Sequence, residues 1–381
     1  MRVITRANNR CTIEASREPW VRDVQWLYWD PPRWLTFWKR GGRGTQLFYI
    51  IWQWGVKSKA RRSMEERDAD VIHHLTFGKY WVPSRLARLG RPFLFGPVGG
   101  GEHSPPGLTA CTSLRGSLTE TSKALATWFV GHFPPSVRLL RSADWTFAAT
   151  KQTEHALRRL GVPRVCVLPQ SGIRPTDIPS ALLSEPQPDR DERVFTLVSA
   201  SRLIHWKAVD LAIEALSQAV KHIPARLIVL QTGPEMENLK RLAKDIGVDR
   251  HVEFKGRLAG LEDVYRQIRS ADALIHPALH EAFGQACLEA LALGTPVICL
   301  NWAGPGLIID QATGIAVQPG NRKETISRLA EAIVTMSGRI RNPEACQARA
   351  YGVFHWEQMA GSLVQEYRKI AANKEPSRPQ A

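Results

Sequence analysis

The stretch ADALIHPALHEAFGQACLEALALGTPVICL, residues 271–300, contains two short apolar runs separated by a helical pattern. The runs at 271–278 and 295–300 have the length and composition of buried parallel strands. Apolar residues at helical spacing, followed by a glycine, predict a helix over 285–294. Because a helix joining two parallel strands is the unit of a doubly wound sheet, this stretch predicts an α/β domain.

The same alternation continues along the rest of the chain. In the second half, strands are expected at 194–200 and 225–233, and helices at 209–223 and 236–247. The first half repeats the pattern less clearly, with candidate strands at 69–75, 91–98, 144–150 and 164–169. Residues 171–193 contain four prolines and no sustained period, which is typical of a linker. The sequence therefore predicts two Rossmann-like domains that face a cleft.

Composition narrows the class of protein. With 381 residues, 44% of them apolar, the chain can bury the cores of two domains. Six scattered cysteines without a C-x-x-C pair indicate neither a disulfide framework nor a zinc site, and they favour a reducing compartment. No run approaches the roughly 18 apolar residues of a membrane-spanning helix, and the N-terminus lacks the apolar region of a signal peptide. We expect a cytoplasmic protein, or one at the cytosolic face of a membrane.

Positive charge is concentrated in the first half. Residues 1–180 hold 27 Lys and Arg against 13 Asp and Glu, whereas residues 181–381 hold 24 against 23. This asymmetry indicates contact with an anionic surface, polymer or lipid. Residues 20–62 add seven of the thirteen tryptophans, interleaved with Arg and Lys, a composition typical of the membrane-water interface. The same aromatic residues could instead pack the core and line an acceptor pocket, and both interpretations stay open.

Two carboxylates, Glu281 and Glu289, lie eight positions apart around a Phe-Gly pair. If the helix begins near Ala282 or Phe283, its first free amides, around Gly284–Ala286, favour an anion. Eight residues at about 1.5 Å span roughly 12 Å, comparable to the distance from a nucleotide's ribose across its diphosphate to an attached sugar. One acid could then hold sugar hydroxyls and the other ribose hydroxyls. An isolated pair at this spacing is more often a solvated residue and a charge favoured by the helix dipole.

Two cations support a site for a diphosphate. Arg202 and Lys207 follow the first strand of the second half, where they could neutralise a leaving group without a metal ion, although a solvated loop has the same composition. A possible metal-binding D-x-D, Asp68-Ala69-Asp70, precedes the strand at 69–75 and is expected at a helix-to-strand turn on the opposite side of the sheet. We therefore expect neither a metal nor another cofactor.

Several motifs together resemble one family. SRLIHWKAVDLAIEAL (201–216), LIVLQTGPEMENLKRLA (227–243), the stretch at 271–300 and FHWEQMAGSLVQEY (354–367) resemble the retaining glycosyltransferases of family 4 (group 1), which have the GT-B fold. The resemblance covers about residues 65–370. It implies a UDP- or GDP-sugar donor in the second domain, an acceptor in the first and chemistry in the cleft. In the family, transfer retains anomeric configuration by attack from the same face, without an enzymic nucleophile.

The resemblance also assigns roles to individual residues. Arg202 and Lys207 match the cations that bind the diphosphate, Glu281 matches the acid that contacts the donor sugar, and Glu289 matches the acid that binds the ribose. Further donor contacts are implied for Gly256, Arg257, Phe283, Gly284 and Gln285. Cleft positions in the first domain are implied for His73, His74, Gly99, Gly100, Gly101, Glu102 and His103. Adjacent strand residues face opposite ways, so at most one of the two histidines faces the cleft, and packing between sheet and helix is an equal alternative for either.

The expected division of the chain is an acceptor-side domain (1–175), a linker (176–193), a donor-binding domain (194–352), a helix that crosses back (353–372) and a disordered tail (373–381). The opening MRVITRANNRCTIE resembles the family's second strand, which implies that roughly one β-α unit is missing. We expect transfer to a glycan or lipid-linked acceptor in cell-surface polysaccharide or glycolipid assembly. An inactive partner protein and a nucleic-acid binder are the alternatives, but no nucleic-acid motif is present.

Overall fold

The computed structural model describes residues 1–39, 44–75, 78–108, 125, 128–129, 133–185 and 194–372. The strands are β1 Arg2–Thr5, β2 Gln25–Tyr28, β3 Ile72–His74, β4 Phe93–Val98, β5 Trp145–Ala148, β6 Val165–Val167, β7 Phe195–Ala200, β8 Ala225–Leu230, β9 Val252–Gly256, β10 Ala273–His276, β11 Val297–Leu300 and β12 Gly314–Val317. The helices are α1 Arg10–Glu14, α2 Arg33–Thr36, α3 Thr45–Glu66, α5 Pro134–Arg141, α6 Lys151–Arg159, α7 Ser180–Ser184, α8 Val209–Ala219, α9 Met236–Asp245, α10 Leu261–Ser270, α11 Gln285–Ala292, α12 Pro305–Ile308, α13 Arg322–Ser337, α14 Pro343–Val353 and α15 Trp356–Ala372.

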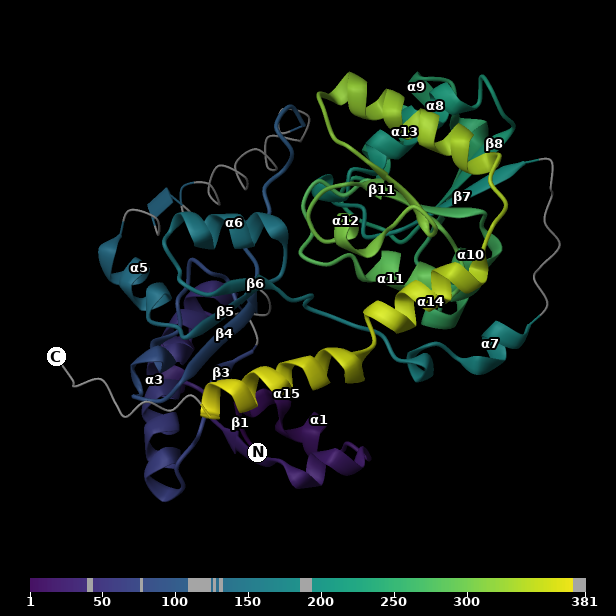
Figure 1. Cartoon of the computed structure of the whole chain (residues 1–381). Coiled ribbons are helices and arrows are strands. Elements are labelled where there is room, and N and C mark those ends of the chain that lie inside the picture. Colours follow the sequence, from purple (N-terminus) through teal and green to yellow (C-terminus); the bar gives the residue numbers. More distant parts are fainter. Residues whose placement is uncertain are drawn as a thin grey trace.

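The second half is built on a six-stranded parallel sheet in the order β12-β11-β10-β7-β8-β9. Helices α8, α9 and α13 cover one apolar core, and α10, α11 and α14 cover the other (Figure 1). The strand order reverses between β7 and β10, which pair directly. Because ligands of doubly wound sheets bind beyond the carboxyl ends of the strands at such a reversal, this edge is where a site is expected.

The first half is built on a smaller parallel sheet in the order β3-β4-β5-β6. Its core includes Tyr80, Phe93, Phe95 and Leu157, all at most 1% exposed. Strand β1 pairs with β2 in a separate two-stranded sheet. Each strand quoted from the apolar runs is present, shorter than its run. Strands β2 and β12 were not predicted, because four-residue segments such as QWLY and GIAV are too short to establish a period.

The two halves are joined by more than the chain that runs between them. The indole Nε1 of Trp302, after β11, donates a hydrogen bond to the carbonyl of His103, after β4, at 2.7 Å. Leu108, from the same loop as His103, is 1% exposed and belongs to the core under α8. At the other end of the chain, α15 crosses toward the first sheet, where Tyr367 contacts His73 on β3 (Figure 1).

The segment predicted as a linker is partly structured. Ile178 and Leu182 are buried in the core that α10, α11 and α14 cover, and Leu182 belongs to the short helix α7. These apolar side chains explain why residues up to 185 pack on the second half despite their prolines. Residues 186–193 of the predicted linker lie outside the described residues, and so does the predicted tail at 373–381.

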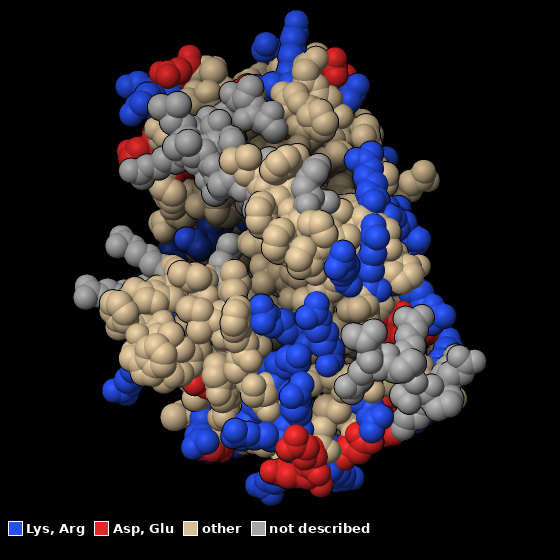
Figure 2. Space-filling view, turned by 90° about the vertical axis from the view of Figure 1, so that its left-hand side faces the viewer, with Lys and Arg blue, Asp and Glu red and all other residues tan. Residues whose placement is uncertain are grey.

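Helix α3 divides the tryptophan-rich segment between core and surface. Phe48 and Val56 are buried, whereas Leu47 and Trp54 are 53% and 59% exposed. Figure 2 views the molecule from the side on which α3 lies in Figure 1, and Lys and Arg side chains gather there. The core interpretation is therefore correct for one face of α3, and the membrane interpretation stays a prediction for the other. Among the described residues, no helix is long and apolar enough to cross a membrane.

Candidate active site

A lysine, a glutamate and a histidine meet at the carboxyl end of the six-stranded sheet. The Nζ of Lys207 lies 2.5 Å from Oε2 of Glu281, and Nε2 of His276 lies 2.6 Å from the same oxygen. His276 is the last residue of β10, and Glu281 lies in the loop between β10 and α11. Lys207 ends a single 3₁₀ turn between β7 and α8. The reversal of strand order thus brings together the loops after β7 and β10, which carry Lys207 and Glu281.

The carboxyl group of Glu281 is held in its ionised form. Burial would raise its pKa, but the hydrogen bond and charge of His276, together with those of Lys207, outweigh burial and lower the pKa to about 2. Opposite charge and hydrogen bonding to the charged form both act in this direction. Glu281 is therefore a fixed acceptor of hydrogen bonds and cannot serve as a proton donor near neutral pH.

Two further contacts fix the loops that carry this cluster. The amide of Leu279 donates to the carbonyl of Trp206 at 2.8 Å. The indole of Trp206 stacks on the ring of His280, with centroids 5.5 Å apart and an interplanar angle of 18°. Because these residues flank Lys207 and Glu281 in sequence, their contacts limit how far the lysine and the acid can separate.

Helix α11 begins at Gln285, as the apolar pattern over 285–294 predicted, and not at Ala282 or Phe283, the start assumed for the anion site. The amide of Gly304 donates to the carbonyl of Glu281 at 2.8 Å, and Gly284 has φ +99°, so residues 281–284 form a loop before the first turn. The predicted consequence still holds in part. Among the described residues, the amides of Gln285 and Ala286 donate to no carbonyl, which leaves a helix N-terminus open toward an anion.

The other residues predicted to bind the nucleotide sugar differ in how far they are buried. Glu289 follows on the second turn of α11, where burial raises its pKa to about 7, against a smaller opposite effect of Gln285. Arg202 and Arg257 are exposed, and Arg202 pairs with no acid within the described ranges. Gly256 has φ +69°, and a Cβ there would lie 3.8 Å from Cγ2 of Thr232, an ordinary contact, so the backbone conformation and not space favours glycine at the end of β9.

The two histidines of β3 point to opposite faces of the first sheet, and both are packed. The Nε2–H of His73 donates to the carbonyl of Gly96 at 2.7 Å, and its Nδ1 accepts from the hydroxyl of Tyr367 at 2.5 Å. Burial lowers the pKa of His73 to about 4, so its ring is neutral near pH 7. His74 lies 2.6 Å from the hydroxyl of Tyr49 on α3. The geometry therefore favours packing between sheet and helix for each histidine.

The glycine-rich loop after β4 is pressed against neighbouring backbone. A Cβ on Gly101 would lie 2.6 Å from the Cα of Thr153, which explains why only glycine fits there. Glu102 is buried, and it accepts hydrogen bonds from the hydroxyls of Thr150 and Thr153 and from the amide of Gly100, at 2.6 to 2.8 Å. Both carboxylate oxygens are therefore occupied by hydrogen bonds within the protein. These bonds assign Glu102 to holding the loop in place and not to binding an acceptor substrate. Gly99, also in this loop, pairs with Gly78 through its amide.

The D-x-D at 68–70 lies in the turn between α3 and β3. Asp68 accepts a hydrogen bond from Nε of Arg91 at 2.9 Å and forms an ion pair with it. In the described part of the chain, no three His, Cys, Asp or Glu side chains are grouped as metal ligands. Asp68 therefore stabilises the turn through Arg91.

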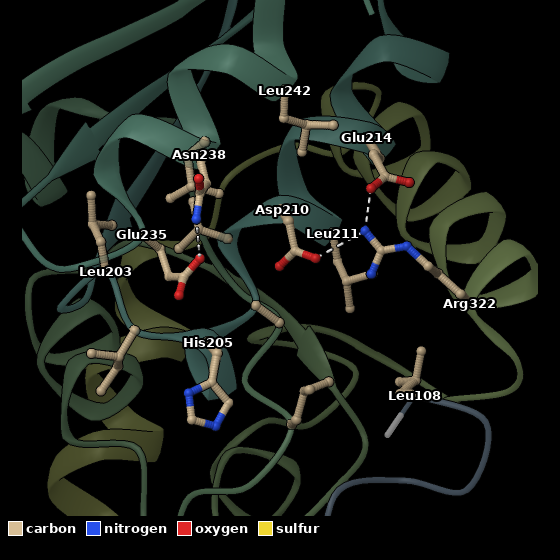
Figure 3. A pocket seen from close by; sticks show the side chains of 15 residues that line it. Leu108, Leu203, His205, Asp210, Leu211, Glu214, Glu235, Asn238, Leu242 and Arg322 are labelled. Carbon is tan, nitrogen blue, oxygen red and sulfur yellow. Dashed lines mark hydrogen bonds and ion pairs between the residues drawn. The ribbon is translucent and has the colours of Figure 1, made fainter. Parts of the chain in front are cut away.

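Two features of this region were missed from the sequence. His276 was read as part of an apolar strand, since only its spacing of five residues from Glu281 hinted at a partner. A pocket of about 190 Å³ also lies beside α8, lined by Leu108 and by second-half residues (Figure 3). There Arg322 on α13 donates to Asp210 at 2.9 Å and pairs with Glu214. These pairs join helices far apart in sequence, which no local pattern reveals.

The chain resembles known glycosyltransferases in sequence over about half of its length. Residues 183–351 match the family model of glycosyl transferases group 1. A Rhodococcus erythropolis D-inositol 3-phosphate glycosyltransferase is 34% identical over 197 residues, covering 49% of this chain and 43% of the relative. A Mycobacterium tuberculosis GDP-mannose-dependent alpha-(1-6)-phosphatidylinositol dimannoside mannosyltransferase is 32% identical over 169 residues, covering 44% of this chain and 42% of the relative. The matches span less than half the length of these relatives.

The similarity to solved structures extends over nearly the whole chain. A glycosyltransferase from Rickettsia africae superposes with a TM-score of 0.60 at 15% identity, covering 98% of this chain and 90% of that one. An Anabaena protein crystallised with UDP superposes with a TM-score of 0.62 at 16% identity, covering 97% and 99%. At such low identity the likeness concerns the fold alone. It confirms the predicted architecture, two Rossmann-like α/β domains of the GT-B type.

Proposed function

We propose that the chain, whose residues 183–351 match the family model of glycosyl transferases group 1, transfers a sugar from a nucleotide-sugar donor to a glycan or lipid-linked acceptor. The observation that carries the proposal is the Lys207-Glu281-His276 cluster beside the open N-terminus of α11. It combines a cation, two free amides and a fixed carboxylate at the edge where doubly wound sheets bind nucleotides.

Each part of the donor has a matching group. The diphosphate is held by Arg202, by Lys207 and by the amides at the start of α11, so that its charge is neutralised without a metal ion. The carboxylate of Glu281 accepts hydrogen bonds from the sugar. Glu289, whose pKa burial raises to about 7, becomes ionised when it accepts the ribose hydroxyls, because such bonds favour the charged form.

The reaction proposed is retaining. Attack on the same face of the sugar as the leaving group requires no nucleophile from the protein. Glu281, the carboxylate nearest this step in the proposal, has its pKa lowered to about 2 and is paired with Lys207 and His276, so it is not assigned that role. As the acceptor's hydroxyl oxygen bonds to the anomeric carbon, the bond from that carbon to the donor diphosphate breaks, and the departing phosphate takes the acceptor's proton. Determining the anomeric configuration of the product by NMR tests this part of the proposal, and an inverted product would contradict it.

The acceptor is proposed to lie at a lipid surface reached through α3. The exposed residues Leu47 and Trp54 are followed along this helix by Lys57 and Arg61, at spacings of seven, three and four residues that keep them on one side. The guanidinium of Arg85 lies 3.9 Å from the ring centroid of Trp54. An apolar end beside a cationic end suits the interface of an anionic membrane. We place the enzyme at the cytosolic face of such a membrane.

The first test is donor binding by the full chain. Thermal unfolding is followed with UDP-, GDP- and ADP-sugars, without added metal, for the unchanged chain and for Glu289→Ala. A ligand at about a hundred times its dissociation constant stabilises the folded state by about 2.7 kcal/mol, which gives a clear shift of the melting temperature. We expect a shift with one nucleotide class that is lost in the variant. No shift with any nucleotide sugar would overturn the proposed function.

A further inference from the structure

His276 is a buried polar residue that ends the apolar strand β10, at the carboxyl end of the sheet. It is 2% exposed and lies on β10 between β7 and β11, where Leu274 and Ile275 on the same strand are fully buried. A buried imidazole costs free energy unless its nitrogens are hydrogen-bonded. Its Nε2 lies 2.6 Å from the carboxylate of Glu281. The hydrogen bond to Glu281 therefore offsets the cost of burying the imidazole, and it connects His276 to the proposed site.

The two donors of the cluster bind the same oxygen of Glu281. Lys207 and His276 both contact Oε2, and Oε1 accepts no hydrogen bond from any residue that the structure describes. The two donors differ in how firmly they are held. His276 is fixed by a strand paired on both sides, whereas Lys207 extends a flexible side chain from a 3₁₀ turn and is also needed by a diphosphate.

We propose that His276 is a positioning residue that holds Oε2 of Glu281 when Lys207 turns to the diphosphate of the donor, so that Oε1 accepts a hydroxyl of the donor sugar. This inference rests on the proposed function. It assigns the strand histidine to recognition of the sugar and leaves binding of the nucleoside diphosphate to Arg202, Lys207 and the start of α11.

The test compares two ligands on three full-length proteins. Calorimetry measures the affinities for the nucleoside diphosphate and for the matching nucleotide sugar in the unchanged chain, in His276→Leu and in His276→Gln. Leucine removes the donor and fills the space, whereas the glutamine amide can still donate to Oε2. We expect His276→Leu to weaken nucleotide-sugar binding about tenfold, the loss typical of one hydrogen bond to a charged group, and to change diphosphate binding by less than about twofold. Glutamine should restore most of the difference.

A second histidine provides the control. His251 lies at the opposite edge of the same sheet, where its Nδ1 bonds the carbonyl of Ala225 at the start of β8, at 2.9 Å. We expect His251→Leu to leave the ratio of the two affinities unchanged. Equal weakening of both ligands by His276→Leu, or an unchanged preference for the nucleotide sugar, would overturn the role of His276. If the unchanged chain binds neither ligand, it is the proposed function that fails.

Discussion

The charge of Glu289 has opposite effects on the stability of the fold and on the proposed function. Burial on α11 raises the pKa of its carboxyl to about 7, whereas the ordinary value is 4.5. In the empty protein an ionised Glu289 therefore weakens the fold, although the proposed site uses that charge to bind ribose. A binding residue that is unfavourable without its ligand is a common compromise between stability and activity.

We predict that Glu289→Gln raises the free energy of unfolding of the empty protein at high pH and not at low pH. As the pH rises, the unfolded carboxyl loses its proton first, so stability declines from about pH 4.5 until the folded group ionises near pH 7. A neutral glutamine avoids this decline, and the gain should be roughly 1–3 kcal/mol above that range.

Urea denaturation at about pH 5 and about pH 8 measures the effect, with the exposed Glu331→Gln on α13 as the control. The same gain at both pH values, or an equal gain in the control, would contradict a raised pKa at Glu289.

At the level of elements, the start of α11 depends on one glycine. Gly284 has φ +99°, and a Cβ there would lie 3.0 Å from Cγ of Pro305 on α12. We predict that Gly284→Ala lowers the free energy of unfolding by about 1–3 kcal/mol and weakens donor binding, because the first turn must shift. Thermal unfolding with and without the donor measures both effects.

Gly352 is the matched control for that substitution. It lies within α14, and a Cβ there would meet nothing within 4 Å. Gly352→Ala should therefore stabilise the protein slightly, by up to about 1 kcal/mol. If both alanine substitutions had the same effect, the left-handed conformation of Gly284 would not be what positions the helix.

Helix α3 carries the prediction about membranes. Lys57 has three cationic neighbours, Arg61, Arg88 and Arg85. Partial burial and the charges of these neighbours lower the pKa of Lys57. We predict that Lys57→Ala with Arg61→Ala reduces binding to vesicles containing anionic lipid. Each cation near such a surface contributes about 1 kcal/mol, so the two together should account for roughly a thirtyfold change in the partition constant.

Vesicle sedimentation measures this partition constant. The matched control replaces Lys240 and Lys244, two exposed lysines of α9 in the second half. Binding that persists in the α3 variant, or that is equally strong to vesicles of zwitterionic lipid, would mean that the exposed face of α3 serves another contact.

At the level of the whole molecule, one hydrogen bond links the end of the chain to the first sheet. The hydroxyl of Tyr367 on α15 donates to His73 on β3. We predict that Tyr367→Phe lowers the free energy of unfolding by about 1 kcal/mol, because the buried imidazole nitrogen loses its donor. Tyr351→Phe is the control, since the buried hydroxyl of Tyr351 has no partner within the described residues and its removal should cost nothing. Equal melting temperatures of the two variants would contradict the linking role.

The acids and cations of the candidate site could be named from the sequence, but the hydrogen bonds between them could not. Glu281 and Lys207 could be identified because family motifs run through both loops, and the amides at the start of α11 followed from the helical pattern. His276 was missed, because a histidine that ends an apolar strand has the same local signature whether it packs or binds. For the same reason His73 and His74 could not be separated from cleft residues until their contacts with Tyr367 and Tyr49 were known.

Local pattern was sufficient for the architecture, because the length of an apolar run and the period of a helix depend only on neighbouring residues. That is why two parallel α/β halves could be predicted before any contact was known. Contact between loops depends instead on the order of strands. Lys207 and Glu281 are 74 positions apart, and they meet because β7 pairs with β10 across the reversal of the sheet. The packing of whole elements sets that order, so only the tertiary structure could reveal that Lys207 and His276 share one oxygen of Glu281.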